Sequence, residues 1–534
     1  MTMSHTILKT SSGSITGVID DRFSSPVEHF RGIQYGSIGK RFARPELLSL
    51  TGDLDATQFG PQCPQARVDV GHLLRIPSQI EMTRVAEDEF KCLNLNVSRP
   101  AAETIQGKGL LPVLAWIHGG SQCVTFPSAA TVVGDPTRLV AESATLQKPA
   151  IVVTFNYRLN MFAFGDGKGE RNLALQDQRL AIEWVYKYIG EFGGDPEQIT
   201  LAGESAGAVY VHAHLLSKTP LTYIRRAALA SGSLHLSPPL PLDAGSGLVA
   251  RIEADLSSRG DSLQDAPAKS LVEAVENCGI NSMWLQQDPE LDGWEKRIEQ
   301  TEALLISDVE YEVSGTLHLS SKSVSLLLIL TLNKSAIWKS GIENMKAEDI
   351  ASIIDECCGK SSKLPELYHI YPDRPASCYY GALDLINDAR FAFPAFDISE
   401  KWRKASPGNV HQCIVDETNP WQASSRAHHA VDLIFLFGGI DLSFNPAAER
   451  AASKLRESWL TFVHGESPWA SDVKYSFGPF GRCGEVDEAE YRTRRRVQCF
   501  EHLRSLGIEK CRQETCNASN RIALQHLIAI AIQR

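Results

Sequence analysis

One five-residue segment of the chain has the residue types and the spacing of a catalytic serine turn. Gly203-Glu204-Ser205-Ala206-Gly207 fits the pattern G-x-S-x-G. The short apolar run Ile199–Ala202 precedes it and a helical apolar pattern over Ala206–Leu216 follows it, so it lies between a predicted strand and a predicted helix. Such a turn is too tight for side chains at its two glycines, and it holds the serine in a strained conformation that exposes the hydroxyl. We therefore expect nucleophilic attack by Ser205.

A serine hydroxyl is a poor nucleophile at neutral pH, so this chemistry also requires a base and an acid that orients the base. In folds with this serine turn, the chain order is serine, then acid, then histidine. The helix after Ser205 favours developing negative charge, because its N-terminus points at the serine. The chain has 15 histidines, so residue types alone leave the choice of base and acid open.

The segments around the serine turn alternate between predicted strands and predicted helices. Pro112–Ile117 and Ala150–Phe155 are apolar runs typical of buried strands, and Leu180–Ile189 has apolar residues at helical spacing. This alternation predicts an α/β fold with a large, mostly parallel central sheet covered by helices on both faces. We interpret the polar, helical region of about 240–300 as a cap or side region. Since no clear domain boundary interrupts the sequence, we expect residues 1–534 to form a single domain.

The composition argues against several classes of function. Apolar residues make up 43% of the chain, charged residues make up 22%, and the net charge is −11, so a nucleic-acid surface is not expected. We interpret the basic run Arg494-Arg495-Arg496 as a solvated or ion-paired face. No apolar segment reaches the roughly 18–20 residues of a membrane span. Because Met1–Asp20 also lacks the pattern of a secretory signal, we expect a cytoplasmic protein.

The cysteines give no sign of a metal site. The chain has 12 of them, with no C-x-x-C pair and no zinc-finger spacing of cysteine and histidine. Acyl transfer through a serine requires neither a metal nor an organic cofactor, so none is expected.

Several further segments match one protein family. They are Phe30–Tyr35, Arg41-Phe42 with Pro45, Ile117–Gly120, Asn156–Leu159 and Phe192–Pro196, the last of which precedes the serine turn. Over nearly its whole length the chain resembles the type B carboxylesterase and cholinesterase-like family. The resemblance implies an α/β-hydrolase fold with helical insertions. It also implies a serine carboxylic ester hydrolase that acts on a small or medium ester.

The resemblance implies the other two members of a catalytic triad. The family base lies nine residues before the glycine that ends an apolar run, and counting back from Gly438 selects His429 over its neighbour His428. The family acid follows a short strand, and the register of that segment selects Glu312, with Glu310 as the alternative. The same resemblance implies a hole for the oxyanion.

Three backbone N–H groups, those of Gly120, Ser121 and Ala206, are the implied oxyanion donors. Ser121 stands where the family commonly has a third glycine, and its side chain restricts the backbone there. The serine N–H can still donate, and we expect the substrate to be cramped at this loop.

One further position, near Arg41, departs from the family pattern. Phe90 stands where the family has the acid that pairs with Arg41, and either Glu89 or Asp88 could replace that acid.

Cys63 and Cys92 match a family disulfide, which need not form in the cytoplasm. Between these two cysteines the cholinesterases carry a tryptophan that binds quaternary ammonium. This chain has no tryptophan from Cys63 to Cys92, so a choline ester is not the expected substrate.

Two other functions remain open. One is a catalytically inactive, cholinesterase-like binding module, and the other is an acyltransferase that uses the same acyl-enzyme. Because Ser205 and His429 are both kept, we favour an enzyme over the module. The residues do not separate hydrolysis from transfer, and they do not define the oligomeric state.

The segment Val313–Lys334 interrupts the family resemblance between Glu312 and Ser335. It contains no acidic residue, and its run Leu326–Leu330 has neither the alternation of a strand nor a helix cap. An exposed apolar run of this kind is an aggregation liability. We interpret 313–334 as a non-native insert, translated from a retained intron, with Glu312 joined to Ser335 in the working enzyme. The alternative is a genuine loop or helix at the mouth of the pocket.

Overall fold

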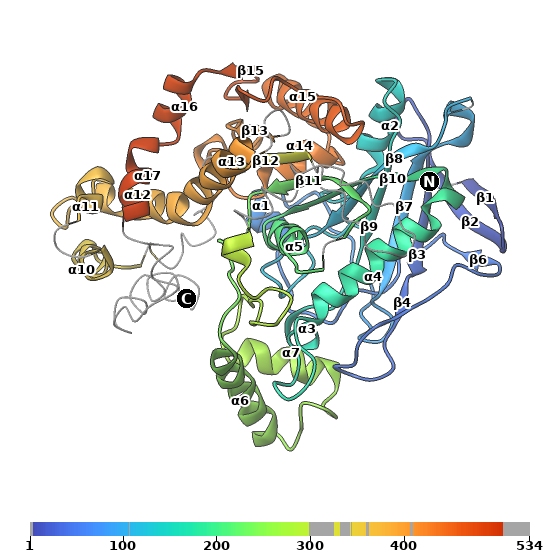
Figure 1. Cartoon of the computed structure of the whole chain (residues 1–534), viewed down its shortest axis with the longest axis horizontal. Coiled ribbons are helices and arrows are strands. Elements are labelled where there is room, and N and C mark those ends of the chain that lie inside the picture. The colour runs from blue at the N-terminus through green and yellow to red at the C-terminus, as the bar shows by residue number, and fades with distance from the viewer. Residues whose placement is uncertain are drawn as a thin grey trace, which may run out of the picture.

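One large β-sheet forms the centre of the molecule (Figure 1). The structure is a computed structural model, and it describes residues 4–505 except 106, 220, 298–324, 332–341, 343, 359–361 and 406–409. Thirteen strands of this described part join the sheet. In spatial order, twelve of them are β1 (Ser4–Thr10), β2 (Gly13–Asp20), β3 (Val27–Gln34), β7 (Asn94–Pro100), β9 (Ile151–Phe155), β8 (Leu111–Ile117), β10 (Gly194–Glu204), β11 (Ile224–Ala230), β12 (Ser325–Thr331), β13 (Val410–Val415), β14 (Lys474–Phe477) and β15 (Cys483–Val486). The short strand β6 (Leu54–Asp55) pairs with β2 outside this order.

The centre of the sheet is parallel and its two edges are antiparallel. From β9 through β8, β10, β11, β12 and β13 to β14, every neighbouring pair is parallel. The strands β1, β2, β3 and β7 at one edge and β15 at the other are antiparallel to their neighbours. The carboxyl ends of β8, β10 and β13 therefore lie at the same edge of the sheet, where a site can form.

Helices cover both faces of the parallel strands, as the strand–helix alternation predicts. On β8, Val113 and Ala115 pack in the same hydrophobic cluster as the helices of one face, and Leu114 and Trp116 pack with those of the other face. The first group includes α3 (Asn160–Phe164), α4 (Leu173–Tyr188) and α5 (Ala206–Leu215), and the second includes α2 (Thr137–Thr145), α14 (Val431–Phe437) and α15 (Pro446–Val463). Burial on both faces explains why these strands are nearly continuous apolar runs.

The run Leu326–Leu330, which the sequence pattern assigns to neither a strand nor a helix, lies in β12. This strand pairs in parallel with β11 on one side and β13 on the other, and Leu327 and Ile329 are buried. The prediction that this run is not a strand was wrong, because alternation of apolar and polar residues marks a strand with one exposed face. A strand in the middle of a parallel sheet is not expected to alternate.

Two groups of helices extend beyond the sheet. The segment predicted as a helical side region contains α6 (Leu242–Ser258) and α7 (Ala268–Asn277), drawn in green in Figure 1. The second group lies toward the carboxyl end of the chain and comprises α10 (Ala347–Cys358), α11 (Leu364–Leu367), α12 (Pro375–Asn387), the π-helix η4 (Asp388–Ala392), α13 (Phe393–Ala405), α16 (Glu488–Arg494) and α17 (Phe500–Ser505). Among the helices of the described residues, none has both the length and the hydropathy needed to cross a membrane.

The basic run Arg494-Arg495-Arg496 is ion-paired, which is one of the two arrangements expected from the sequence. Arg494 and Arg495 both contact Asp416, with N–O distances of 3.1 and 2.7 Å. Arg496 pairs with Asp388 at 2.8 Å. Since Asp416 directly follows β13, these pairs tie the last described helices to the sheet.

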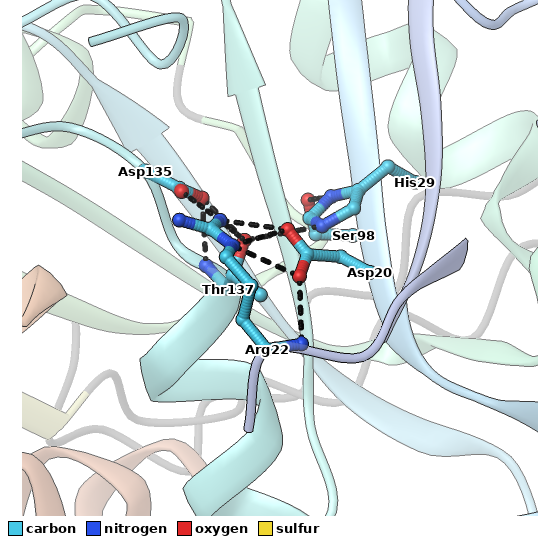
Figure 2. Close-up of polar contacts among 6 residues, drawn as sticks. All are labelled: Asp20, Arg22, His29, Ser98, Asp135 and Thr137. Atoms are coloured by element: carbon cyan, nitrogen blue, oxygen red, sulfur yellow. Dashed lines mark hydrogen bonds and ion pairs between the residues drawn. The ribbon is translucent and has the colours of Figure 1, made fainter. Parts of the chain in front are cut away.

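A polar network, buried at Asp20 and His29 but exposed at Arg22, joins the antiparallel edge of the sheet to the start of α2. Figure 2 shows Arg22 beside the carboxylates of Asp20 and Asp135, at 2.7 and 2.6 Å. The other members of the network are His29, Ser98 and Thr137. The ring of His29 lies between two hydroxyls, with Nδ1 2.8 Å from Oγ of Ser98 and Nε2 3.1 Å from Oγ1 of Thr137. Burial lowers the pKa of His29 to about 4, so this ring is neutral at neutral pH.

Three other buried histidines are held neutral in the same way. Burial lowers the pKa of His118 to about 4 and that of His212 and His214 to about 3. In the unfolded chain a histidine titrates near pH ~6.5. Between these values the unfolded chain binds protons that the folded protein does not, so acid favours unfolding.

We expect the free energy of unfolding to be at its full value above about pH 6.5 and to decrease as the pH falls toward about 4, by on the order of 3 kcal/mol for each such histidine. Guanidinium unfolding at several pH values measures this slope. His29→Gln should lower the free energy of unfolding at pH 7.5. It should also reduce the pH dependence of that free energy by the contribution of one proton, because it removes the titrating ring. An unchanged slope in this variant would contradict the assignment of His29.

Candidate active site

The serine turn connects β10 to α5 and has the strained geometry that its sequence predicts. Ser205 follows the last residue of β10 and has φ 57° and ψ −121°, a conformation that residues with side chains rarely adopt. A Cβ atom at Gly203 would stand 2.5 Å from the carbonyl carbon of Gly207. A Cβ atom at Gly207 would stand 2.1 Å from the carbonyl oxygen of Ile117, at the end of β8. Both positions therefore require glycine, and the turn places the serine at the carboxyl edge of the sheet.

His429 reaches Ser205 from the connection between β13 and α14. Its Nε2 lies 3.0 Å from Oγ of Ser205, which is hydrogen-bond distance. The ring is 9% exposed and packs against Phe391 of the π-helix η4, with ring centroids 5.5 Å apart. Residues separated by 224 positions in the chain are thus brought together as the resemblance implies.

Glu204 also contacts the histidine, a role that the sequence analysis did not assign to it. One carboxylate oxygen lies 3.3 Å from Nε2 of His429, and the side chain is fully buried. In the sequence, Glu204 counts only as a variable position of the serine turn. The feature of the sequence that could have identified this contact is a charged residue at the end of an apolar strand, since a buried charge requires a nearby partner.

His428, the alternative candidate for the base, points away from Ser205 toward protein groups. Its Nε2 lies 2.9 Å from Nδ2 of Asn419, and its Nδ1 lies 2.9 Å from the backbone oxygen of His429. Burial lowers the pKa of this ring. The geometry therefore agrees with His429, rather than His428, as the residue facing the nucleophile.

The loop after β8, which carries the implied oxyanion donors Gly120 and Ser121, begins against the serine turn. A Cβ atom at Gly119 would stand 3.3 Å from Cβ of Ser205, so this loop lies against the serine. Gly120 has φ 109°, and a Cβ there would meet the oxygen of Val124 at 1.9 Å. Ser121 has φ 54°, in the region that favours glycine, so the replacement of the family's third glycine does strain the loop. The third implied donor, Ala206, is the first residue of α5.

His118 fixes the start of this loop. Its Nδ1 lies 2.8 Å from the carbonyl oxygen of Gly119, and because a carbonyl can only accept, Nδ1 carries the proton. Tyr157 stacks on the ring at 4.3 Å between centroids and donates its hydroxyl to the carbonyl of His118 at 2.6 Å. The loop is therefore held from two directions.

The partner of Arg41, which the sequence left open between two acids, is Glu89. The two side chains form a paired contact, with Nε and one terminal nitrogen 2.7 and 2.6 Å from the two carboxylate oxygens. Asp88 instead accepts from the backbone N–H of Phe90 at 2.8 Å. Phe90 itself is 43% exposed. The charge pair of the family is thus kept with its acid moved by one residue.

Cys63 and Cys92, the possible disulfide of the sequence analysis, are buried thiols. Hydrogen bonding to Cys63 and burial raise the pKa of the Cys92 thiol. The raised pKa makes the Cys92 thiol a poor nucleophile in this state.

Glu312, the acid that the resemblance implies, lies outside the described residues, and so does its alternative, Glu310.

A strained serine between strand and helix, met by a histidine at the carboxyl edge of a parallel sheet, defines the α/β-hydrolase class. The chain belongs to the carboxylesterase family, whose family model matches residues 4–501. It is therefore a serine carboxylic ester hydrolase.

Individual relatives agree with this membership. Lipase 3 of Yarrowia lipolytica (strain CLIB 122 / E 150) is 31% identical over 466 residues, which cover 83% of this chain and 86% of that protein. The inactive carboxylesterase-like protein VdtD of Byssochlamys spectabilis is 38% identical over 233 residues, 42% of this chain and 37% of that protein. The solved structure of the Geobacillus stearothermophilus carboxylesterase EST55 has a TM-score of 0.70 at 23% identity and covers 92% of this chain and 99% of that one. This last likeness supports the fold.

The packing of the serine turn generates a test. Gly207→Ala should lose at least about a hundredfold in ester hydrolysis and should lower the thermal midpoint, because its Cβ collides with a strand carbonyl. Gly247→Ala is the matched control, since it lies in α6 with nothing within 4 Å of the added atom. That control should keep full activity and gain up to about 1 kcal/mol of stability. A Gly207→Ala enzyme with normal activity would contradict the described turn.

Proposed function

We propose that Ser205, His429 and Glu312 form the catalytic triad, and that Gly120, Ser121 and Ala206 supply the oxyanion hole. The observation that carries this proposal is the 3.0 Å contact between Oγ of Ser205 and Nε2 of His429. It joins a strained serine to a buried histidine at the edge where the strands end. The role of Glu312 rests on the family resemblance alone.

The proposed reaction proceeds through an acyl-enzyme. Oγ of Ser205 forms a bond to the ester carbonyl carbon while His429 takes its proton. The oxyanion intermediate collapses, the bond to the alcohol oxygen breaks, and the alcohol takes the proton from His429. A water molecule then gives a proton to His429, attacks the acyl carbon, and releases Ser205, which regains the proton. Each backbone donor to the oxyanion is typically worth roughly 3–4 kcal/mol of barrier.

The proposed substrate is a small or medium carboxylic ester without a quaternary ammonium group. The segment between Cys63 and Cys92 has no tryptophan to face such a cation. Transfer of the acyl group to another alcohol or amine uses the same intermediate, so product analysis with and without added alcohol separates the two reactions.

Ser205→Ala should abolish hydrolysis of p-nitrophenyl esters and covalent labelling by a fluorophosphonate, because both require Oγ. His429→Ala should behave alike, while His428→Ala should keep much more activity. In the wild type, kcat/KM should fall as the pH is lowered, since only a neutral imidazole accepts the proton. Labelling of the Ser205→Ala protein at the active site would overturn the nucleophile, and exchanged behaviour of the two histidine variants would overturn the base.

We also propose that the working enzyme lacks Val313–Lys334, with Glu312 joined to Ser335. The resemblance matches the segment Leu304–Ile306 to the short strand before the family acid, and these residues lie outside the described part of the chain. Support comes from the absence of acidic residues in 313–334 and from the family pattern that resumes at Ser335.

Deletion of 313–334 is a stringent test, because β12 lies inside the removed segment. The deletion variant should be soluble and more active than the full-length chain, since the acid then stands at its family spacing and a misplacement of about 1 Å can cost on the order of a hundredfold in rate. Sequencing of the mature transcript gives an independent measurement. An unfolded deletion variant beside an active full-length protein would contradict the proposal and would assign β12 to the native sheet.

We propose a cytoplasmic location, in which Cys63 and Cys92 remain thiols. Fractionation of cells tests it, and recovery of the protein from the culture medium would contradict it.

A further inference from the structure

His428 is buried directly before the proposed base, and each of its ring nitrogens has a partner. Nδ1 lies 2.9 Å from the backbone oxygen of His429, and Nε2 lies 2.9 Å from Nδ2 of Asn419. The side chain of His428 is only 3% exposed, and that of Asn419 only 1%. Water therefore does not compete for these contacts, and the positions of the protons can be worked out from the partners.

Asn419 fixes the direction of the network. Its Oδ1 accepts from the backbone N–H groups of Trp421 and Gln422 at 3.0 and 2.9 Å, and such groups can only donate. Its Nδ2 donates to the carbonyl oxygen of Leu74 at 2.7 Å, so the second proton of Nδ2 is directed to His428. Nε2 of His428 must then be the acceptor, and Nδ1 must carry the ring proton.

The proton on Nδ1 of His428 is donated to the carbonyl of His429. That carbonyl belongs to the peptide that enters Ala430, which has φ 63° and ψ 8°. A left-handed conformation costs a residue with a side chain roughly 1–2 kcal/mol, so the peptide needs an external hold. Because this peptide sets the direction of the His429 side chain, the hydrogen bond controls where Nε2 meets Ser205.

The other end of the network reaches the segment between Cys63 and Cys92. Leu74 is the last residue of α1 (Val70–Leu74), and the carbonyl groups at a helix end lack partners within the helix. Asn419 supplies one of those partners. Leu74 itself is 1% exposed and packs in the same hydrophobic cluster as α14, the helix that follows His429. The network therefore ties α1 to the base through two side chains.

We propose that His428 and Asn419 are positioning residues for His429, acting through the proton that Asn419 fixes on Nδ1 of His428. This inference rests on the proposed role of His429 as the base. Neither residue contacts Ser205 in the described geometry, so the expected effect is on the rate of the chemical step rather than on substrate binding.

Two near-isosteric substitutions separate the two nitrogens of His428. An asparagine at 428 can place its amide nitrogen where Nδ1 stands, and a glutamine can place its amide oxygen where Nε2 stands. His428→Asn should keep kcat within about threefold, while His428→Gln and His428→Ala should lose about tenfold with KM changed less than about twofold. Asn419→Leu should lose kcat like His428→Gln, because a leucine side chain of similar size has no proton to direct to Nε2.

His464→Ala is the matched control for loss of a histidine-to-carbonyl hydrogen bond. Its Nε2 lies 3.1 Å from the oxygen of Pro149, just before the start of β9 and thus at the opposite edge of the sheet from Ser205. This variant should keep wild-type kcat. Thermal midpoints of all variants show whether any loss of rate merely follows loss of the folded state.

The rate of fluorophosphonate labelling at Ser205 is the second measurement, because it reports activation of the nucleophile directly. The positioning role is supported if labelling slows in His428→Gln and Asn419→Leu but not in His428→Asn. It is overturned if His428→Asn is as slow as His428→Gln, if all variants match the wild type, or if rate follows the folded fraction. Absence of labelling in the wild type would instead overturn the proposed function.

Discussion

The close approach of the β8 end to the serine turn is the constraint on which the rest of the site depends. The backbone of Ile117 leaves no room for a side chain at Gly207, and the serine turn itself leaves little room for one at Gly119. A third glycine, Gly232 after β11, is equally confined, since a Cβ there would stand 2.3 Å from the oxygen of Ser205. Ser205, the proposed nucleophile, is therefore held by contacts between main chains on three sides. Such contacts leave few alternative positions for the hydroxyl, which is what a reaction sensitive to small displacements requires.

Two histidines that are not proposed to transfer protons fix the main chain on the two sides of this turn. His118 donates from Nδ1 to the carbonyl of Gly119, before the proposed oxyanion donors, and His428 donates from Nδ1 to the carbonyl of His429, the proposed base. Burial lowers the pKa of both rings. An imidazole suits this task because it is rigid and can donate a proton while neutral, whereas a lysine or arginine in the same place would bring a charge that burial disfavours.

Much of the architecture could be predicted because parallel strands buried on both faces leave continuous apolar runs, as at 112–117 and 150–155. The same rule, applied to Leu326–Leu330, would have found β12. The serine turn was predictable from local spacing, and the choice of His429 required the family resemblance. The contacts of Glu204 and Asn419 were not predicted, because each joins residues that are far apart in the chain. The choice of Glu89 as the partner of Arg41 was left open, because it depends on which of two neighbouring carboxylates faces the guanidinium.

The displaced acid beside Arg41 has a consequence for how such a chain can change over generations. The Arg41 side chain is 8% exposed, and a buried guanidinium that loses its carboxylate costs a protein about 3–5 kcal/mol. An ancestor with the acid at 90 that first lost it would have carried that penalty, whereas one that first gained Glu89 would not. The order of substitution that keeps every intermediate folded therefore passes through a sequence with both acids. Position 90 can change to an exposed phenylalanine without this cost only after that step.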